Sequence, residues 1–119
     1  MGTLNLENLD VCCRAMAIGE TVWNLVETWD YFSKDTIGKQ WLKSSDSIAA
    51  NIAEGYGRFC YKENKLFCYY SRGSLMESRT WLVKAYNRKL IDRMNFDHLY
   101  QELEIIRKML NNYINSIGK

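Results

Sequence analysis

The segment NFDHLYQELEIIRKMLNNYINSI, residues 95–117, decides the fold, because its apolar residues recur at alternating steps of three and four. The recurring residues are Phe96, Leu99, Leu103, Ile106, Leu110, Tyr113 and Ile117. This spacing gathers them on one side of an α-helix, as a seam that faces another helix. Asn95 is the predicted N-cap, and Gly118 follows as a stop. The segment therefore predicts an amphipathic helix that packs in a helical bundle.

The preceding segment predicts another long helix, over residues 61–88, with residues 87–95 as the connecting turn. Its most regular apolar and small residues form a predicted inward stripe: Cys68, Ser71, Leu75, Ser78, Leu82 and Ala85. Gly73 stands in the middle of this helix, where glycine costs about 1 kcal/mol relative to alanine. We therefore expect a neighbouring helix to pack closely against Gly73.

Two further helices are predicted nearer the N-terminus. Residues 36–56 mix bulky residues with serines and alanines that let a neighbouring backbone approach, and Asp35 is the predicted N-cap. Gly55 and Gly57 are expected to supply the backbone freedom for a tight exit. Residues 9–29 carry two adjacent apolar seams, and a loop is expected over residues 31–34. Two seams make an apolar face that is wider than one partner helix covers. We therefore expect this helix to contact a second helix or another subunit.

These four helices predict an all-α fold, an antiparallel up-down-up-down four-helix bundle, as one domain over residues 1–119. The chain has no proline, the strongest helix breaker. Its 47% hydrophobic and 25% charged residues are typical of globular proteins. No apolar run approaches the roughly 20 residues that span a bilayer, and the first residues lack a signal-peptide pattern. We therefore expect a cytoplasmic protein with no membrane partner.

The residue content disfavours an enzyme or a metal site. His98 is the single histidine, and the sequence has no P-loop, no G-x-S-x-G elbow and no dinucleotide glycine pattern. Cys12 and Cys13 are adjacent and Cys60 and Cys68 are eight residues apart, so no C-x-x-C spacing for metal binding or redox chemistry occurs. We therefore predict no catalytic residue, no metal and no cofactor.

One polar group has a structural and a functional interpretation. It comprises Asn51 and Glu54 on the second predicted helix, Arg58 just beyond it, and Glu77 on the third. Glu77 shares a stripe with aromatic residues, so we expect it to be partly buried and in need of a partner. The structural interpretation, which we favour, is a polar network that fixes helix register. The functional interpretation is a polar pocket at a subunit interface.

The best indication of function is a basic stripe on the third predicted helix. Steps of four and three place five cations, a tyrosine and a methionine along one side: Arg58, Lys62, Lys65, Tyr69, Arg72, Met76 and Arg79. Residues 34–93 hold twelve Lys and Arg against six Asp and Glu, whereas residues 1–33 hold one against five. Such cations could follow the phosphates of RNA or DNA, with the tyrosine stacked on a base. The alternative is a solvated face whose charges pair with Glu63 and with acidic residues of another helix.

Three runs of sequence resemble one protein family. Residues 47–58 (SIAANIAEGYGR) are similar to the signature of the four-helix bundle proteins encoded in intervening sequences of bacterial 23S rRNA genes. Residues 73–77 (GSLME) and 6–11 (LENLDV) resemble two further segments of that family. One departure is Ala49, where the family often has proline. The resemblance carries over only structural positions: Asn51, Glu54, Gly55, Gly57, Arg58, Gly73 and Glu77.

The resemblance implies an up-down four-helix bundle that often assembles as a ring-like homopentamer. It also implies a relation to the accessory proteins of diversity-generating retroelements, which work with a reverse transcriptase and bind nucleic acid through basic surfaces. Two hypotheses follow. The first is a non-enzymatic, nucleic-acid-associated accessory protein that uses the basic stripe. The second is an interaction module, either a homo-oligomer or a holder of a protein partner, that uses the double apolar face of the first helix.

Overall fold

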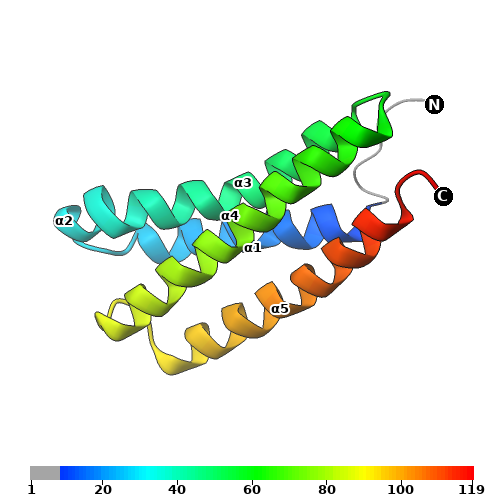
Figure 1. Cartoon of the computed structure of the whole chain (residues 1–119). Helices are drawn as coiled ribbons and strands as arrows, with labels where there is room; N and C mark the ends of the chain where they lie inside the picture. Colours follow the sequence, from blue (N-terminus) through cyan, green and yellow to red (C-terminus); the bar gives the residue numbers. More distant parts are fainter. Residues whose placement is uncertain (1–8) are drawn as a thin grey trace.

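The computed structural model describes residues 9–119, which form four long helices that pack side by side (Figure 1). They are α1 (Asp10–Val26), α3 (Lys39–Tyr56), α4 (Tyr61–Asn87) and α5 (Arg93–Ser116). The short α2 (Tyr31–Ser33) and a π-helical turn (Lys34–Gly38) lead into α3. The all-α four-helix fold class is confirmed. Residues 6–8 of the LENLDV run lie outside the described residues. No helix within residues 9–119 combines the length and apolar character needed to cross a membrane.

Contacts across the bundle give the direction of each helix. Between α1 and α3, Cys12 meets Ala49 and Gly19 meets Asp46. Between α3 and α4, Ser45 meets Ser78 and Ile48 meets Ser71. Between α4 and α5, Asn64 meets Tyr113 and Arg79 meets Glu104. Within each pair of helices, the contact that has the higher residue number on one helix has the lower residue number on the other. Consecutive long helices are therefore antiparallel, in up-down-up-down order.

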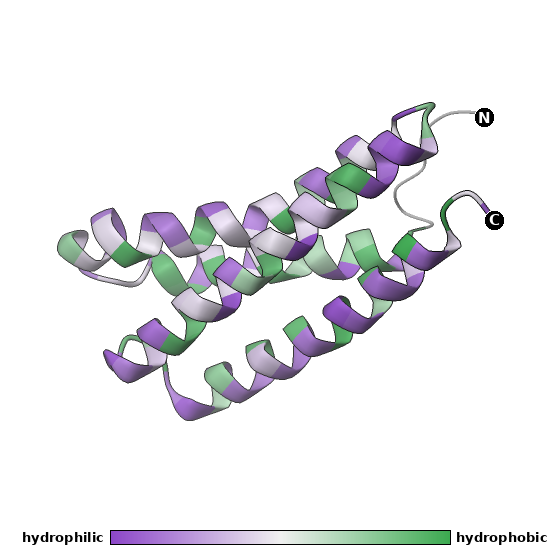
Figure 2. Cartoon of the chain, in the orientation of Figure 1, coloured by the Kyte–Doolittle hydropathy of each residue, from purple (hydrophilic) through white to green (hydrophobic). Residues whose placement is uncertain are grey.

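The core lies where the apolar seams of the helices meet. Leu99, Leu103, Ile106 and Leu110 of the predicted α5 seam are at most 1% exposed, and Phe96 and Tyr113 at its sides are half-buried. Burial of each such leucine or isoleucine contributes about 1.5–3 kcal/mol to folding. Figure 2 shows the corresponding alternation of apolar and polar positions along each helix. The α5 seam is therefore confirmed as a core element.

Small polar side chains make the contact between α3 and α4 close. Ser45 and Ser78 are fully buried, and their Oγ atoms share a hydrogen bond of 2.8 Å. Ser71 Oγ donates to the Ile48 carbonyl oxygen at 2.7 Å. These bonds offset the cost of burying hydroxyl groups. All six residues of the predicted inward stripe on α4 are buried.

The helical segment that leads into α3 begins earlier than predicted. Asp30, not Asp35, is the N-cap, and its Oδ2 accepts from the Ser33 backbone N–H at 3.2 Å. Residues 31–34, which we expected to form a loop, are therefore helical, and Asp35 instead pairs with Lys39 at 2.9 Å. The physical reason is that α1 already ends at Val26. The turn between the two helical segments is therefore complete before residue 30, and the next segment begins at Tyr31.

Helix α5 also begins earlier than predicted, because Asp92 rather than Asn95 is its N-cap. The Asp92 Oδ1 atom accepts from the Asn95 backbone N–H at 2.8 Å. An ionised carboxylate is favoured at the positive N-terminal end of a helix, where it is a stronger acceptor than an amide oxygen. At the other end, Gly118 follows the helix with a φ of 85°, as its predicted role as a stop requires.

Three glycines have roles that differ from the predicted ones. The expectation of close packing at Gly73 is wrong, because a Cβ atom there would meet no atom of residues 9–119 within 4 Å. Gly55 and Gly57 do not have positive φ angles, so the expected backbone freedom is not used. Gly55 is instead buried, and a Cβ atom there would lie 2.9 Å from the Asn64 carbonyl oxygen. The close approach of helices that we assigned to Gly73 therefore occurs at Gly55.

Candidate nucleic-acid interface

The predicted basic stripe starts on the solvent side of α4 and ends against α5. Lys62 and Tyr69 are exposed near the start of α4. Further along, Arg72 Nη1 donates to Asn111 Oδ1 of α5 at 3.0 Å, and Arg79 Nη1 lies 3.0 Å from Glu104 Oε1. Positions spaced by seven residues drift by about 20° per repeat around a straight helix. This drift turns the stripe from solvent towards the boundary with α5.

Arg58 lies in the turn between α3 and α4 and is held by both helices. Its guanidinium pairs with Glu54 at 2.6 Å and with Glu63 at 3.4 Å, and it lies 4.8 Å from the centroid of the Phe67 ring. The alternative interpretation of the stripe predicted pairing with Glu63 and with acidic residues of another helix. Arg58 and Arg79 make such ion pairs.

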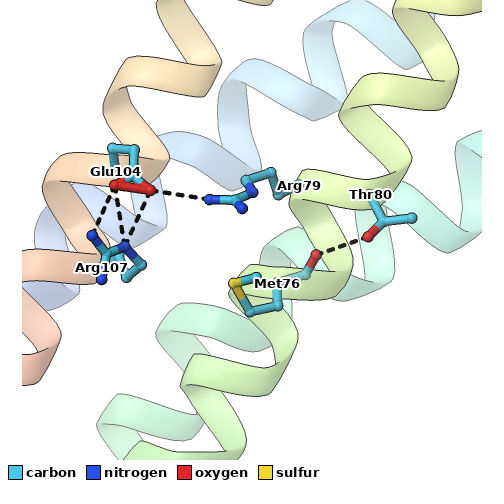
Figure 3. Close-up of polar contacts among 5 residues, drawn as sticks. All are labelled: Met76, Arg79, Thr80, Glu104 and Arg107. Atoms are coloured by element: carbon cyan, nitrogen blue, oxygen red, sulfur yellow. Dashed lines mark hydrogen bonds and ion pairs between the residues drawn. The ribbon is translucent and has the colours of Figure 1, made fainter.

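A three-residue charge cluster joins the two helices at the end of the stripe (Figure 3). Glu104 accepts from Arg79 of α4 at 3.0 Å and from Arg107 of α5 at 3.0–3.1 Å. The hydrogen bonds and positive charge of Arg107 lower the pKa of the Glu104 carboxyl. Glu104 therefore stays ionised under ordinary conditions. One carboxylate divided between two guanidiniums leaves the cluster with a net positive charge.

The remaining residues of the stripe either form no ion pair among residues 9–119 or contact only other residues of α4. Neither Lys62 nor Lys65 forms an ion pair within residues 9–119. The Arg72 guanidinium lies 5.1 Å from the centroid of the Tyr69 ring. The exposed Met76 uses its carbonyl oxygen to accept from Thr80 Oγ1 at 3.1 Å (Figure 3). The stripe thus combines paired arginines with lysines that have no ion-pair partner among residues 9–119.

Residues of α5 complete the basic surface, and reasoning from the sequence missed them. Arg107 and Lys108 lie beside the α4 cations: both act on the Glu104 carboxyl electrostatically, and the Arg79 guanidinium lies 5.4 Å from the centroid of the Tyr100 ring. We call the resulting surface the α4–α5 strip: Lys65, Arg72 and Arg79 with Arg107 and Lys108. Tyr100, Glu104, Arg107 and Asn111 recur at steps of four, three and four, beside the apolar seam. That spacing is the signal that could have identified them.

The four polar residues that we expected to fix the helix register do not form one network. Asn51 Nδ2 donates to the Ser47 carbonyl oxygen at 2.9 Å, and Glu54 pairs with Arg58. Glu77 is exposed, so the expectation of partial burial is wrong. Its Oε2 accepts from Trp81 Nε1, one turn further along α4, at 3.1 Å. Trp81 is half-buried, yet it leaves the Glu77 carboxylate exposed to solvent.

Comparisons with known proteins agree with this architecture. A family model described as 23S rRNA-intervening sequence protein matches residues 7–112. A crystal structure from Bacteroides thetaiotaomicron VPI-5482, described as a protein with unknown function from the S23 ribosomal protein family, has a TM-score of 0.80 at 20% sequence identity. The similarity covers 89% of this chain and 96% of that one. No curated protein matches the sequence.

Proposed function

We propose, from the premise that this chain belongs to the 23S rRNA-intervening sequence protein family, that it is a non-enzymatic cytoplasmic accessory protein that binds nucleic acid through the α4–α5 strip. The observation that carries the proposal is the charge balance of the strip. Its cations come from two adjacent helices, and the carboxylate among them, Glu104, is shared by Arg79 and Arg107. Because one anion is divided between two guanidiniums, the surface stays positive and attracts phosphates.

The spacing of the cations also fits a nucleic-acid backbone. Lys65, Arg72 and Arg79 are separated by seven residues each, so they extend over about 21 Å of α4 at the helical rise per residue. A row of this length beside Arg107 and Lys108 can follow several successive phosphates of one strand. Neutralising phosphates releases condensed counterions, which supplies affinity for RNA and for DNA alike.

The salt dependence of binding tests this proposal. We expect the purified protein to bind fluorescein-labelled RNA or DNA oligonucleotides in anisotropy titrations at about 50 mM salt. The logarithm of the association constant should fall with the logarithm of salt concentration with a slope of about −3, as expected for four to five phosphate contacts with a single strand. Absence of binding to both nucleic acids at low salt would end the proposal.

A second candidate function, self-assembly, is favoured by the solvent side of α1. One of its two apolar seams is largely buried, whereas the other is only partly buried and leaves Met16 and Trp23 56% and 53% exposed. They border hollows between α1 and α3 that are lined by apolar side chains, such as Leu42 and Ala50, together with charged residues at their rims. Exposed apolar surface of this kind is typical of a protein interface. We propose a homo-oligomer, with the five copies that the family resemblance implies; another protein held on the same face is the alternative occupant.

The mass of the protein in solution tests self-assembly. We expect light scattering to give a multiple of the 14.0 kDa chain mass, and Trp23→Glu to shift the distribution to smaller species, because a carboxylate at the contact must be desolvated. Tyr31→Glu, at a residue of the short α2 that is 80% exposed, is the matched control and should leave the mass unchanged. A wild-type mass of 14.0 kDa at every concentration contradicts self-assembly. An assembly would bring several copies of the strip together and raise the avidity for a long nucleic acid.

A further inference from the structure

Aromatic side chains project into solvent at the end of the bundle where α3 connects to α4. Phe59, in the turn, is fully exposed, and Tyr61 and Tyr69 of α4 are 66% and 44% exposed. We call these three residues the aromatic patch. Outward positions of a bundle helix are ordinarily polar, and Phe59 contributes nothing to the core. Large exposed apolar side chains grouped in this way indicate a binding surface.

Cations alternate with these rings. Tyr61, Lys65, Tyr69 and Arg72 follow each other at steps of four, four and three, so they share one side of α4. Lys65 has no ion pair within residues 9–119, and the Arg72 guanidinium lies 5.1 Å from the centroid of the Tyr69 ring. The aromatic patch therefore adjoins the α4–α5 strip and extends it towards the α3–α4 turn.

We propose that the nucleic acid bound by this surface is single-stranded, with unpaired bases stacked on the aromatic patch and phosphates held by the lysines and arginines. The inference rests on the nucleic-acid-binding function proposed above. In a duplex the faces of the bases are stacked on one another, so exposed rings gain nothing from it. In a single strand every base offers a π-face, and stacking on an aromatic ring is favourable whatever the sequence.

The outward side of α4 argues against the main alternative, insertion of this helix into a duplex major groove. Base edges in that groove are recognised by arginine, lysine, asparagine and glutamine side chains. Besides Lys62 and Arg72, the outward positions of α4 carry the exposed apolar or aromatic residues Leu66, Tyr69 and Met76. The arginines lie to one side, turned towards α5, where Arg72 contacts Asn111. Such a helix is suited to stacking and backbone contact rather than to groove readout.

Anisotropy with matched single-stranded and duplex probes tests the inference on the full chain. The probe is a fluorescein-labelled strand of about 16 nucleotides without self-complementarity, alone or annealed to its complement, as DNA and as RNA. We expect the wild type to bind the single strand about tenfold more tightly than the duplex. The double variant Phe59→Ala/Tyr69→Ala should weaken single-strand binding by about tenfold or more, since each stacked base is worth roughly fivefold or more in affinity. Duplex binding should change less than twofold.

Matched variants separate stacking from other effects. Tyr31→Ala/Phe32→Ala removes two exposed aromatic residues at the opposite end of the bundle and should leave binding unchanged. Phe59→Trp/Tyr69→Trp should retain or strengthen single-strand binding, because the larger rings still stack. Equal affinity for both probes, or an unchanged single-strand affinity in Phe59→Ala/Tyr69→Ala, overturns this inference and leaves the proposed function intact. An equal loss in Tyr31→Ala/Phe32→Ala also overturns it. Failure to bind either probe overturns both.

Discussion

The double variant Lys65→Glu/Lys108→Glu is expected to bind nucleic acid about a hundredfold more weakly than the wild type at roughly 50 mM salt. One phosphate contact is worth about tenfold in affinity between 1 M and 50 mM salt, because the association constant varies with salt to a power of about 0.7–0.9 per contact. Removing two contacts therefore costs about a hundredfold, and the slope of the salt dependence should become shallower by about 1.4 for a single strand. The measurement is the anisotropy titration described above, repeated at several salt concentrations.

These two lysines separate binding from stability better than the arginines of the strip. Neither forms an ion pair within residues 9–119, whereas Arg79 shares Glu104 with Arg107 and its removal disturbs that cluster. Lys43→Glu/Lys84→Glu is the matched control, because it makes the same change in net charge at two exposed lysines outside the strip. An equal loss of affinity in the control would show that binding follows net charge rather than the α4–α5 strip. Thermal unfolding followed by circular dichroism confirms that each variant is folded.

Gly55→Ala is expected to lower the free energy of unfolding by about 1 kcal/mol. A Cβ atom at this position would lie 2.9 Å from the Asn64 carbonyl oxygen and 3.0 Å from Phe67 Cβ, so α3 and α4 must move apart. Overpacking of this kind costs about 1–3 kcal/mol, which outweighs the roughly 1 kcal/mol that alanine gains over glycine in a helix. Urea denaturation of both proteins measures the difference. An unchanged or raised stability would contradict the close contact between the two helices.

Gly73→Ala is the matched control and is expected to raise the free energy of unfolding by about 1 kcal/mol. The position is helical and exposed, and within the part of the chain that the structure describes a Cβ atom there meets no atom within 4 Å. Only the helix propensity and the smaller backbone entropy of the unfolded chain then change, and both favour alanine. A loss of stability would show that another surface packs against Gly73. The two glycines carry over from the same family resemblance, yet they should respond in opposite directions.

The sequence by itself determined the four long helices and, for α4 and α5, the side that is buried. The three-four spacing of Leu99, Leu103, Ile106 and Leu110 can be satisfied in only one way, because those side chains share a helix face and must leave water. The same holds for the small-residue stripe of α4. Fold class and core were therefore predictable from periodicity, which depends only on residue order.

Contacts between helices were decided by the tertiary structure alone. Periodicity shows that Arg79 lies on one side of α4, but the rotation and depth of α5 place Glu104 and Arg107 against it. The same packing makes Gly55, not Gly73, the point of closest approach. The physical reason is that helical spacing specifies an angle around one axis, whereas a charge cluster or a steric contact depends on the separation and register of two axes. Those quantities are settled only when all the apolar seams are buried together.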